Sequence, residues 1–264
     1  MEAGSSFALV LGAGGTVGMA YHAGTLMALH EVCGIDAAEA DLIVGTSAGS
    51  VVAAYLRTGW TVKDLWELAL GTHPKVAGLS PEEREAEQRA HLLPAWTNRA
   101  EFLRRSVGSA AVMAQTLLPF APRPPAALGR QFPGGLYSME GVRSRFEEEV
   151  GTSWPERATY ICASDLRTGR RVVFGTPTAP EADLPTAVMA SCAIPGFFRP
   201  VRVGATVLVD GGVSSTTHLD LAAITGHHRI VTVAPMAFDP AAAPANLAQL
   251  ARRRPARALA REAR

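Results

Sequence analysis

The chain has 264 residues, of which 48% are hydrophobic and 19% are charged, and its formal net charge is +1. This length and hydrophobic content suffice for a buried core and exclude an intrinsically disordered chain. The near-neutral charge gives no overall field that would attract nucleic acid, so no nucleic-acid partner is predicted.

Neither a signal peptide nor a membrane span is predicted from the sequence. Glu2 stands where a signal peptide carries basic residues, and no stretch approaches the roughly 18 to 20 apolar residues of a membrane helix. The expected location is the cytoplasm, with a peripheral position at a membrane as the alternative. No metal or other cofactor is predicted. The cysteines fit no disulfide framework or zinc site and are expected to be reduced thiols packed as small apolar residues: Cys33, Cys162 and Cys192.

The first sixty residues alternate between short apolar runs and helical patterns. Phe7–Leu11 is predicted to be a strand buried on both faces, and a helix is predicted from Met19 to about Val32. Asp41–Val44 is a second predicted strand and Ala48–Arg57 a second helix. This alternation predicts an α/β fold with a parallel sheet and crossover helices.

A glycine-rich loop, residues 12–18, joins the first strand to the first helix. A dinucleotide-binding loop would need glycine where Val17 stands, and a P-loop would need a Gly-Lys-Ser/Thr ending that is absent. The favoured interpretation is an oxyanion hole, in which backbone N–H groups of the loop face the charge on an attacked carbonyl. A dinucleotide-binding oxidoreductase and a purely structural turn are the alternatives.

The second strand runs directly into Gly45-Thr-Ser47-Ala-Gly49 and then into the second helix. A G-x-S-x-G motif between a strand and a helix is typical of a nucleophile elbow, a sharp turn that exposes the serine hydroxyl. Gly45 and Gly49 would let the two backbones approach, and the helix N-terminus would favour negative charge nearby. The motif predicts Ser47 as a nucleophile, whereas a serine-capped helix start is the alternative.

Residues 71–137 interrupt this pattern. They contain a charged helical stretch (Pro81–Arg89), a longer amphipathic one (Asn98–Leu118) and the segment PFAPRPPAALGRQFPGG, whose prolines break regular structure. We interpret them as a helical cap inserted into a single domain that spans residues 1–264. A connecting subdomain without a role at the site is the alternative.

The strand pattern then resumes. The predicted elements are strands at Ala158–Ser164 and Arg171–Phe174, a helix near Leu184–Cys192, a hairpin at Val201–Val209 about Gly204-Ala205, a last strand at Arg229–Ala234, and a helix rich in arginine and alanine at Pro244–Arg264. For the last helix a solvated face is favoured over a membrane-facing one, because its apolar positions are mostly alanine.

One predicted strand ends in Asp210, which Gly211 and Gly212 follow. A serine hydrolase needs a base, usually a histidine that an acid orients. His218 would complete a formal Ser–Asp–His triad, although an exposed loop histidine is the favoured interpretation. Alternatively, Asp210 could take the serine proton directly if burial raises its pKa.

The glycine loop, GTSAGS and ASCAIPGFFRPVRVGATVLVDGGV together resemble the patatin-like phospholipases, including the catalytic domain of cytosolic phospholipase A. The resemblance covers residues 7–58 and 158–235 and does not reach the insert. It implies a three-layer α/β/α fold with a mostly parallel central sheet, and a dyad without histidine in which Ser47 attacks the ester and Asp210 accepts its proton. It also implies that Gly14 and Gly15, together with Gly12, supply the oxyanion hole. The positions that match the family before its aspartate are Ser191, Ala193, Pro195, Phe198 and Pro200.

The resemblance also implies a substrate class, namely phospholipids, lysophospholipids or acylglycerols, with transient contact to a membrane surface. Acyl transfer on the same dyad, or an idle scaffold that binds lipid or protein, are alternatives. The sequence departs from the family pattern in two ways. The family commonly has Arg or Lys where Val17 stands, and the spacing from the loop to Gly24 is one residue longer than usual. These departures bear on the rate and the substrate more than on the reaction class. Arg199 and Arg202 could attract a phosphate head group, although surface residues at a strand end need no such role.

Overall fold

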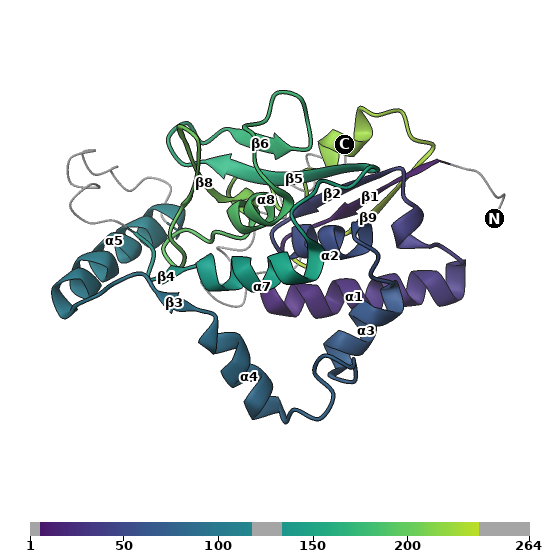
Figure 1. The fold of residues 1–264 in the computed structure, drawn as a ribbon. Helices are drawn as coiled ribbons and strands as arrows, with labels where there is room; N and C mark the ends of the chain where they lie inside the picture. Colours follow the sequence, from purple (N-terminus) through teal and green to yellow (C-terminus); the bar gives the residue numbers. More distant parts are fainter. Residues whose placement is uncertain (1–5, 118–133, 238–264) are drawn as a thin grey trace, which may run out of the picture.

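The computed structural model describes residues 6–117 and 134–237 (Figure 1). The predicted helix at 244–264 and most of the proline-rich segment lie outside these residues. The strands are β1 (Phe7–Leu11), β2 (Leu42–Thr46), β3 (Leu93–Pro94), β4 (Tyr137–Ser138), β5 (Ala158–Asp165), β6 (Arg171–Phe174), β7 (Val201–Val203), β8 (Thr206–Asp210) and β9 (Arg229–Val233). The α-helices are α1 (Gly15–Cys33), α2 (Ala48–Arg57), α3 (Val62–Leu70), α4 (Pro81–Ala90), α5 (Arg99–Leu117), α7 (Glu140–Val150), α8 (Leu184–Ser191) and α9 (Leu219–Ala223). Two short 3₁₀ helices are η1 (Ala37–Glu39) and η2 (Gly211–Val213).

The main sheet has the strand order β7–β8–β5–β2–β1–β9, and β6 also pairs with β5. The four strands β5, β2, β1 and β9 are parallel, whereas β6, β8 and β7 are antiparallel to their neighbours. The predicted parallel sheet is therefore confirmed for its central part, and the predicted hairpin is β7–β8.

Alternate residues of β1 pack on opposite faces of the sheet. Leu9 and Leu11 belong to the larger core, which contains apolar residues of α1, α2, α3, α7 and α8. Ala8 and Val10 belong to a smaller core with residues of α9. Because both faces are covered, β1 reads as a continuous apolar run. Helices on both faces of a mostly parallel sheet give the three-layer α/β/α architecture that was predicted (Figure 1).

Several helix boundaries differ from the sequence prediction. Helix α1 begins at Gly15 instead of Met19, because the Gly18 N–H donates to the Gly14 carbonyl and closes the first turn (2.9 Å). Helices α3 and α7 were not predicted. Cys33 at the end of α1 is exposed, so its predicted packing in the interior is wrong. No helix in the described parts of the chain is long and apolar enough to cross a membrane.

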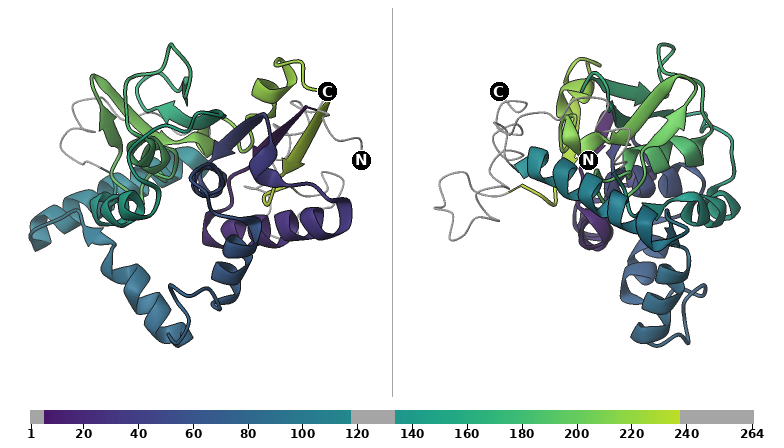
Figure 2. Two further views of the ribbon diagram at one scale, coloured as in Figure 1. Left: turned by 45° about the vertical axis from the view of Figure 1, so that its right-hand side comes forward. Right: turned by 90° about the vertical axis from the view of Figure 1, so that its left-hand side faces the viewer.

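The insert at 71–137 contains α4, β3 and α5, as its two helical patterns predicted. Both helices project away from the sheet (Figures 1 and 2). The ends of the insert return to the body through the β3–β4 pairing, in which Leu93 lies opposite Ser138, and through a bridge between Tyr137 and Phe198. These contacts hold the base of the insert beside the segment that precedes β7.

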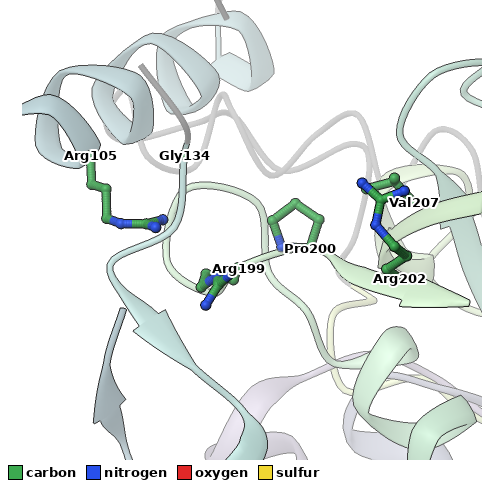
Figure 3. A pocket seen from close by; sticks show the side chains of 6 residues that line it. All are labelled: Arg105, Gly134, Arg199, Pro200, Arg202 and Val207. Atoms are coloured by element: carbon green, nitrogen blue, oxygen red, sulfur yellow. The ribbon is translucent and has the colours of Figure 1, made fainter. Parts of the chain in front are cut away.

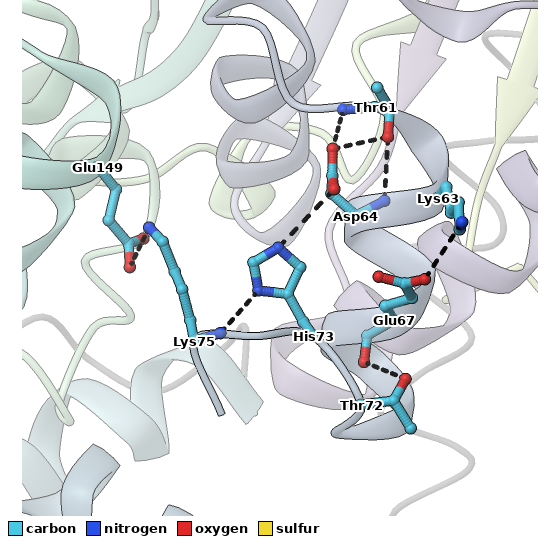
Figure 4. Close-up of polar contacts among 8 residues, drawn as sticks. All are labelled: Thr61, Lys63, Asp64, Glu67, Thr72, His73, Lys75 and Glu149. Atoms are coloured by element: carbon cyan, nitrogen blue, oxygen red, sulfur yellow. Dashed lines mark hydrogen bonds and ion pairs between the residues drawn. The ribbon is translucent and has the colours of Figure 1, made fainter. Parts of the chain in front are cut away.

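A polar cluster fixes the start of the insert (Figure 4). Thr61 and Asp64 form a capping box at the start of α3, which satisfies backbone N–H groups that the helix leaves free. The His73 Nε2 lies 3.8 Å from the Asp64 Oδ1, and the Lys75 Nζ lies 3.3 Å from the Glu149 Oε1 on α7. The chain that leaves α3 is thus attached both to α3 and to α7.

Candidate active site

The carboxyl ends of β1, β2 and β8 meet at one place in the sheet. Leu11 of β1 lies opposite Gly45 of β2, so the glycine loop and the serine turn begin side by side. Strand β5 pairs with β2 as far as Thr46, opposite Cys162, and its next residue, Ala163, lies opposite Asp210 of β8. Strands β2 and β8 therefore meet end to end along β5. This topology brings together Ser47 and the acid that were each predicted at a strand end.

Ser47 occupies the turn with φ 52° and ψ −119°, a left-handed φ that is uncommon for a residue other than glycine. Such a conformation costs on the order of 1 to 3 kcal/mol and persists only where the surroundings hold it. A Cβ at Gly49 would lie 2.0 Å from the Leu11 carbonyl oxygen, and one at Gly45 would lie 2.7 Å from the Ser50 Cα. Both glycines are thus needed for the close approach that a nucleophile elbow requires.

Two further serines hold the strained turn. The Ser47 N–H donates to the Ser191 Oγ (2.9 Å), and the Ser191 hydroxyl donates to the Cys162 carbonyl (2.6 Å). The Ser50 hydroxyl donates to the Ser47 carbonyl (2.6 Å). Sequence reasoning gave neither serine this role, since Ser191 lies far from the turn in sequence and only its match to the family block drew attention to it.

Asp210 is buried, with 6% of its surface exposed. Burial raises its pKa to about 6, while hydrogen bonds from the Ser47 side chain and from the Gly212 N–H lower it in part. The Gly212 N–H donates to Oδ1 at 2.7 Å. A Cβ at Gly211 would lie 2.2 Å from the Cys162 carbonyl oxygen, so the chain after the acid can turn this closely only with glycine there. The carboxylate is thus held beside the serine in a site that water hardly reaches.

The glycine loop lies against the turn after Asp210. The Gly12 N–H donates to the Val233 carbonyl (2.9 Å), and the Ala13 N–H donates to the Thr216 carbonyl (2.8 Å). Gly12 is therefore corrected from an oxyanion donor to a residue that anchors the loop. Among the described residues, the N–H groups of Gly14 and Gly15 donate to no acceptor, and they open helix α1.

His22, which sequence reasoning missed, lies directly beneath this loop. It is fully buried, and its Nε2 lies 2.8 Å from the Gly12 carbonyl oxygen. Because a carbonyl can only accept, Nε2 carries the proton of the neutral ring. Burial lowers the pKa of His22 to about 4, so the ring stays neutral near pH 7. His22 thus supports the loop backbone from α1.

His218 is fully buried and not exposed, so the expectation of an exposed loop histidine is wrong. Its Nδ1 lies 3.1 Å from the Thr46 Oγ1, and burial lowers the pKa of its ring to about 3. Within residues 6–117 and 134–237 it forms no hydrogen bond with Ser47 or Asp210. The ring lies beside the end of β2, because the chain after the DGG turn packs α9 against β1 and β2.

Cys192 is the other nucleophilic side chain beside the dyad. Burial and the charge of Asp210 raise the pKa of its thiol to about 12, against smaller opposite effects of hydrogen bonds from Ser50 and Ser47. A thiol with such a pKa stays protonated at neutral pH and is a poor nucleophile. Cys192 is therefore not a candidate nucleophile at neutral pH.

Val17 lies in the first turn of α1 and is 80% exposed. The position where a cation was expected from the resemblance therefore presents an apolar side chain to the surface next to Gly14 and Gly15. Ile194 and Val213, which follow Cys192 and the DGG turn, are 43% and 53% exposed. Exposed apolar side chains thus occur on the three segments that carry the glycine loop, Cys192 and the DGG turn.

Residues 9–223 match the family model described as patatin-like phospholipase. Among solved structures, the chain is similar to VipD from Legionella pneumophila, with 16% identity and a TM-score of 0.46 over 88% of this chain and 51% of that one. It is also similar to the type III effector protein ExoU, with 18% identity and a TM-score of 0.36 over 98% and 52% of the two chains. The heterodimeric complex ExoU–SpcU from the type III secretion system of Pseudomonas aeruginosa gives 21% identity and a TM-score of 0.35 over 98% and 51%. The chain spans about half the length of these structures.

Proposed function

This chain belongs to the patatin-like phospholipase family, and from that premise we propose that it hydrolyses carboxylic esters of lipids with Ser47 as nucleophile and Asp210 as general base. One observation carries the proposal. Asp210 is buried at the end of β8, where that strand meets the end of β2 along β5, and burial, offset in part by the Ser47 side chain, raises the pKa of its carboxyl to about 6, which suits proton transfer near neutral pH. No other group is needed to activate the serine.

The reaction follows from this arrangement. The Ser47 Oγ attacks the ester carbonyl while its proton passes to Asp210, and the N–H groups of Gly14 and Gly15 bind the resulting oxyanion. Collapse of the tetrahedral intermediate breaks the ester C–O bond, and the leaving alcohol takes the proton from Asp210. A water molecule then gives its proton to Asp210 and attacks the acyl-enzyme. Release of the fatty acid returns the proton to Ser47.

The surroundings of the dyad favour a lipid over a polar ester. Val17, Ile194 and Val213 present apolar side chains on the three segments that carry the glycine loop, Cys192 and the DGG turn. An acyl chain would gain by covering such surface, at roughly 25 cal/mol per Å² of apolar area removed from water. We therefore propose an acyl chain bound over these residues, during transient contact with a lipid surface.

The test is hydrolysis of p-nitrophenyl esters and lysophospholipids by the wild type, Ser47→Ala and Asp210→Asn, with the exposed Ser144→Ala as control. We expect both dyad variants to lose roughly 10³-fold or more of kcat and the control to lose nothing. A fluorophosphonate should label the wild type and not Ser47→Ala. Absence of both hydrolysis and labelling in the wild type would make the chain an idle scaffold. Transfer to an added acceptor alcohol in preference to water would make it an acyltransferase.

A further inference from the structure

The glycine loop has a buried partner that the proposed reaction leaves unused, His22 on α1. A pocket of about 270 Å³ between the insert and the β7–β8 hairpin also lies outside the reaction (Figure 3). None of the residues that line this pocket belongs to the glycine loop, the serine turn or the DGG turn: Arg105, Gly134, Arg199, Pro200, Arg202 and Val207. Of these two features, His22 is the one that contacts a segment used in the proposed reaction.

One peptide unit of the loop, between Gly12 and Ala13, is held from both sides. Its carbonyl oxygen accepts from the His22 Nε2 (2.8 Å), and its N–H donates to the Thr216 carbonyl (2.8 Å). The two partners come from different segments, namely α1 and the chain between the DGG turn and α9. Because a peptide unit is planar, these two hydrogen bonds fix its orientation within the loop.

The proposed oxyanion donors follow this peptide unit directly. The next N–H groups along the chain are those of Gly14 and Gly15, and Gly15 begins α1 with a left-handed φ of 61°. His22 lies seven residues further along, which is about two turns of the same helix. Its hydrogen bond to Gly12 therefore ties α1 back to the end of β1 and closes a ring of chain that contains both donors.

The position of α1 along its own axis decides where these donors lie relative to Ser47. The side chains of α1 that pack in the interior, such as Ala23 and Leu26, make apolar contacts, which have no preferred direction. A hydrogen bond is directional and weakens steeply when its angle is distorted. A displacement of about 1 Å near the reacting atoms can slow a reaction by roughly 10²-fold. The single directional contact from His22 to the loop thus has a large effect available to it.

His22 also has an unfavourable feature that a residue present only for packing would avoid. Since its Nε2 carries the proton, its Nδ1 is an acceptor, and among the described residues this buried atom has no hydrogen-bond partner. A buried polar atom without a partner costs about 1 to 3 kcal/mol. A leucine would fill a similar volume without this cost. What leucine cannot supply is a donor for the Gly12 carbonyl.

We propose that His22 is a positioning residue for the oxyanion hole: its hydrogen bond to the Gly12 carbonyl holds the N–H groups of Gly14 and Gly15 where negative charge develops. This inference rests on the proposed hydrolysis at Ser47 and adds a residue to its machinery. His22 acts through the loop and not on the ester itself. Its contribution therefore belongs to the transition state and not to the binding of substrate.

The first experiment compares His22→Leu, which removes the donor, with His22→Gln, which keeps an N–H donor near the end of its side chain. We expect His22→Leu to lose about tenfold or more of kcat with KM within about twofold, and His22→Gln to recover most of the loss. The control is His30→Leu, an exposed histidine on the same helix, which should keep kcat. An unchanged kcat in His22→Leu, or an equal loss in both His22 variants, would overturn the proposal.

The second experiment measures binding of a ligand that carries an oxyanion. In a long-chain alkyl trifluoromethyl ketone the Ser47 Oγ adds to the carbonyl carbon and its proton passes to Asp210, which leaves a negative oxygen in the oxyanion hole. The corresponding alcohol binds without this charge. We expect His22→Leu to weaken the ketone by about tenfold or more and the alcohol by less than about twofold. Equal weakening of both ligands would reject a role at the oxyanion.

The third experiment measures amide hydrogen exchange of the loop without turnover, in Ser47→Ala. The Ala13 N–H should exchange slowly there, because it is bonded to the Thr216 carbonyl. We expect added His22→Leu to speed this exchange by about tenfold or more and His22→Gln to restore the slow rate. The same rate in all three proteins would overturn the proposal. Because this measurement needs no activity, failure of the loop support is distinguishable from failure of the dyad.

Discussion

At the scale of single residues, the properties of Ser47 and Asp210 come from their surroundings. The serine has a left-handed φ that its hydrogen bonds to Ser191 and Ser50 support. The carboxylate has lost most of its water and keeps one backbone donor, from Gly212. An ordinary surface aspartate would be too weak a base for a serine hydroxyl, and burial raises the pKa of Asp210 toward the value that the proposed base needs.

The first prediction concerns the pH dependence of hydrolysis. Asp210 acts as a base only when deprotonated, and its pKa is raised to about 6. We therefore expect kcat/KM to rise with pH and to reach a plateau above an inflection near pH 6. If His218 were the base, its pKa of about 3 would give no inflection there. A pH–rate profile between pH 4 and 8 distinguishes the two.

The second prediction links the same shift to stability. The pKa of Asp210 rises from its ordinary 3.8 in the unfolded chain to about 6 in the folded one, so the folded state holds the proton more tightly. Its ionisation therefore removes stability as pH rises from about 4 to 6, by on the order of 2 to 3 kcal/mol at 1.36 kcal/mol per unit.

Urea unfolding of the wild type and of Asp210→Asn at several pH values measures this effect. We expect the free energy of unfolding of the wild type to fall relative to that of the variant as the pH increases from about 4 to 6. A difference between the two proteins that is independent of pH would contradict the buried, shifted carboxylate.

At the scale of elements, close backbone approach decides the site. Helix α2 packs so near β1 that the Gly49 position tolerates no side chain, and the DGG turn passes equally close to β5 at Gly211. These approaches bring the serine, the acid and the glycine loop together where the ends of β2 and β8 meet along β5. Tight contact between elements, and not flexibility of the glycines, is what the G-x-S-x-G and DGG motifs supply here.

The third prediction tests that contact. In Gly49→Ala the new Cβ would lie 2.0 Å from the Leu11 carbonyl oxygen, so we expect a loss of about 3 kcal/mol or more in the free energy of unfolding. Gly18→Ala is the matched control, because its Cβ would have its nearest neighbour at 3.6 Å. This control should keep or slightly gain stability, since alanine favours helix over glycine by roughly 1 kcal/mol. Equal stability of the two variants would refute the packing explanation.

At the scale of the whole molecule, one sheet joins the N-terminal and C-terminal halves of the described chain. Strand β9 pairs with β1 at one end, and β7–β8 continue the sheet through β5 at the other. The insert at 71–137 leaves and re-enters this body, with the Ala95 N–H bonded to the Leu136 carbonyl (2.8 Å) at its base. We propose that it is a cap within one domain.

The fourth prediction follows from the proposal that the sheet and the insert form one domain. Unfolding should be one cooperative transition, detected at the same urea concentration by circular dichroism and by the fluorescence difference between wild type and Trp96→Phe. Trp96 reports on the insert, where its ring contacts Phe102 at 5.1 Å between centroids. An earlier midpoint for the Trp96 signal would instead make the insert a separate folding unit.

The sequence by itself determined the strand–helix alternation, the parallel sheet and the positions of Ser47 and Asp210 at strand ends. These are local properties, since an apolar run or a serine flanked by glycines can be recognised within a few residues of sequence. It misjudged His218 and Gly12, and it missed His22, because burial and backbone pairing depend on segments far away in the chain. Only the tertiary structure decided those.

The pKa of Asp210 depends on tertiary structure in the same way. The desolvation that raises it arises only when the ends of β2 and β8 meet along β5. The sequence thus specified which chemical groups are present, and the packing of distant segments decided their protonation and their neighbours.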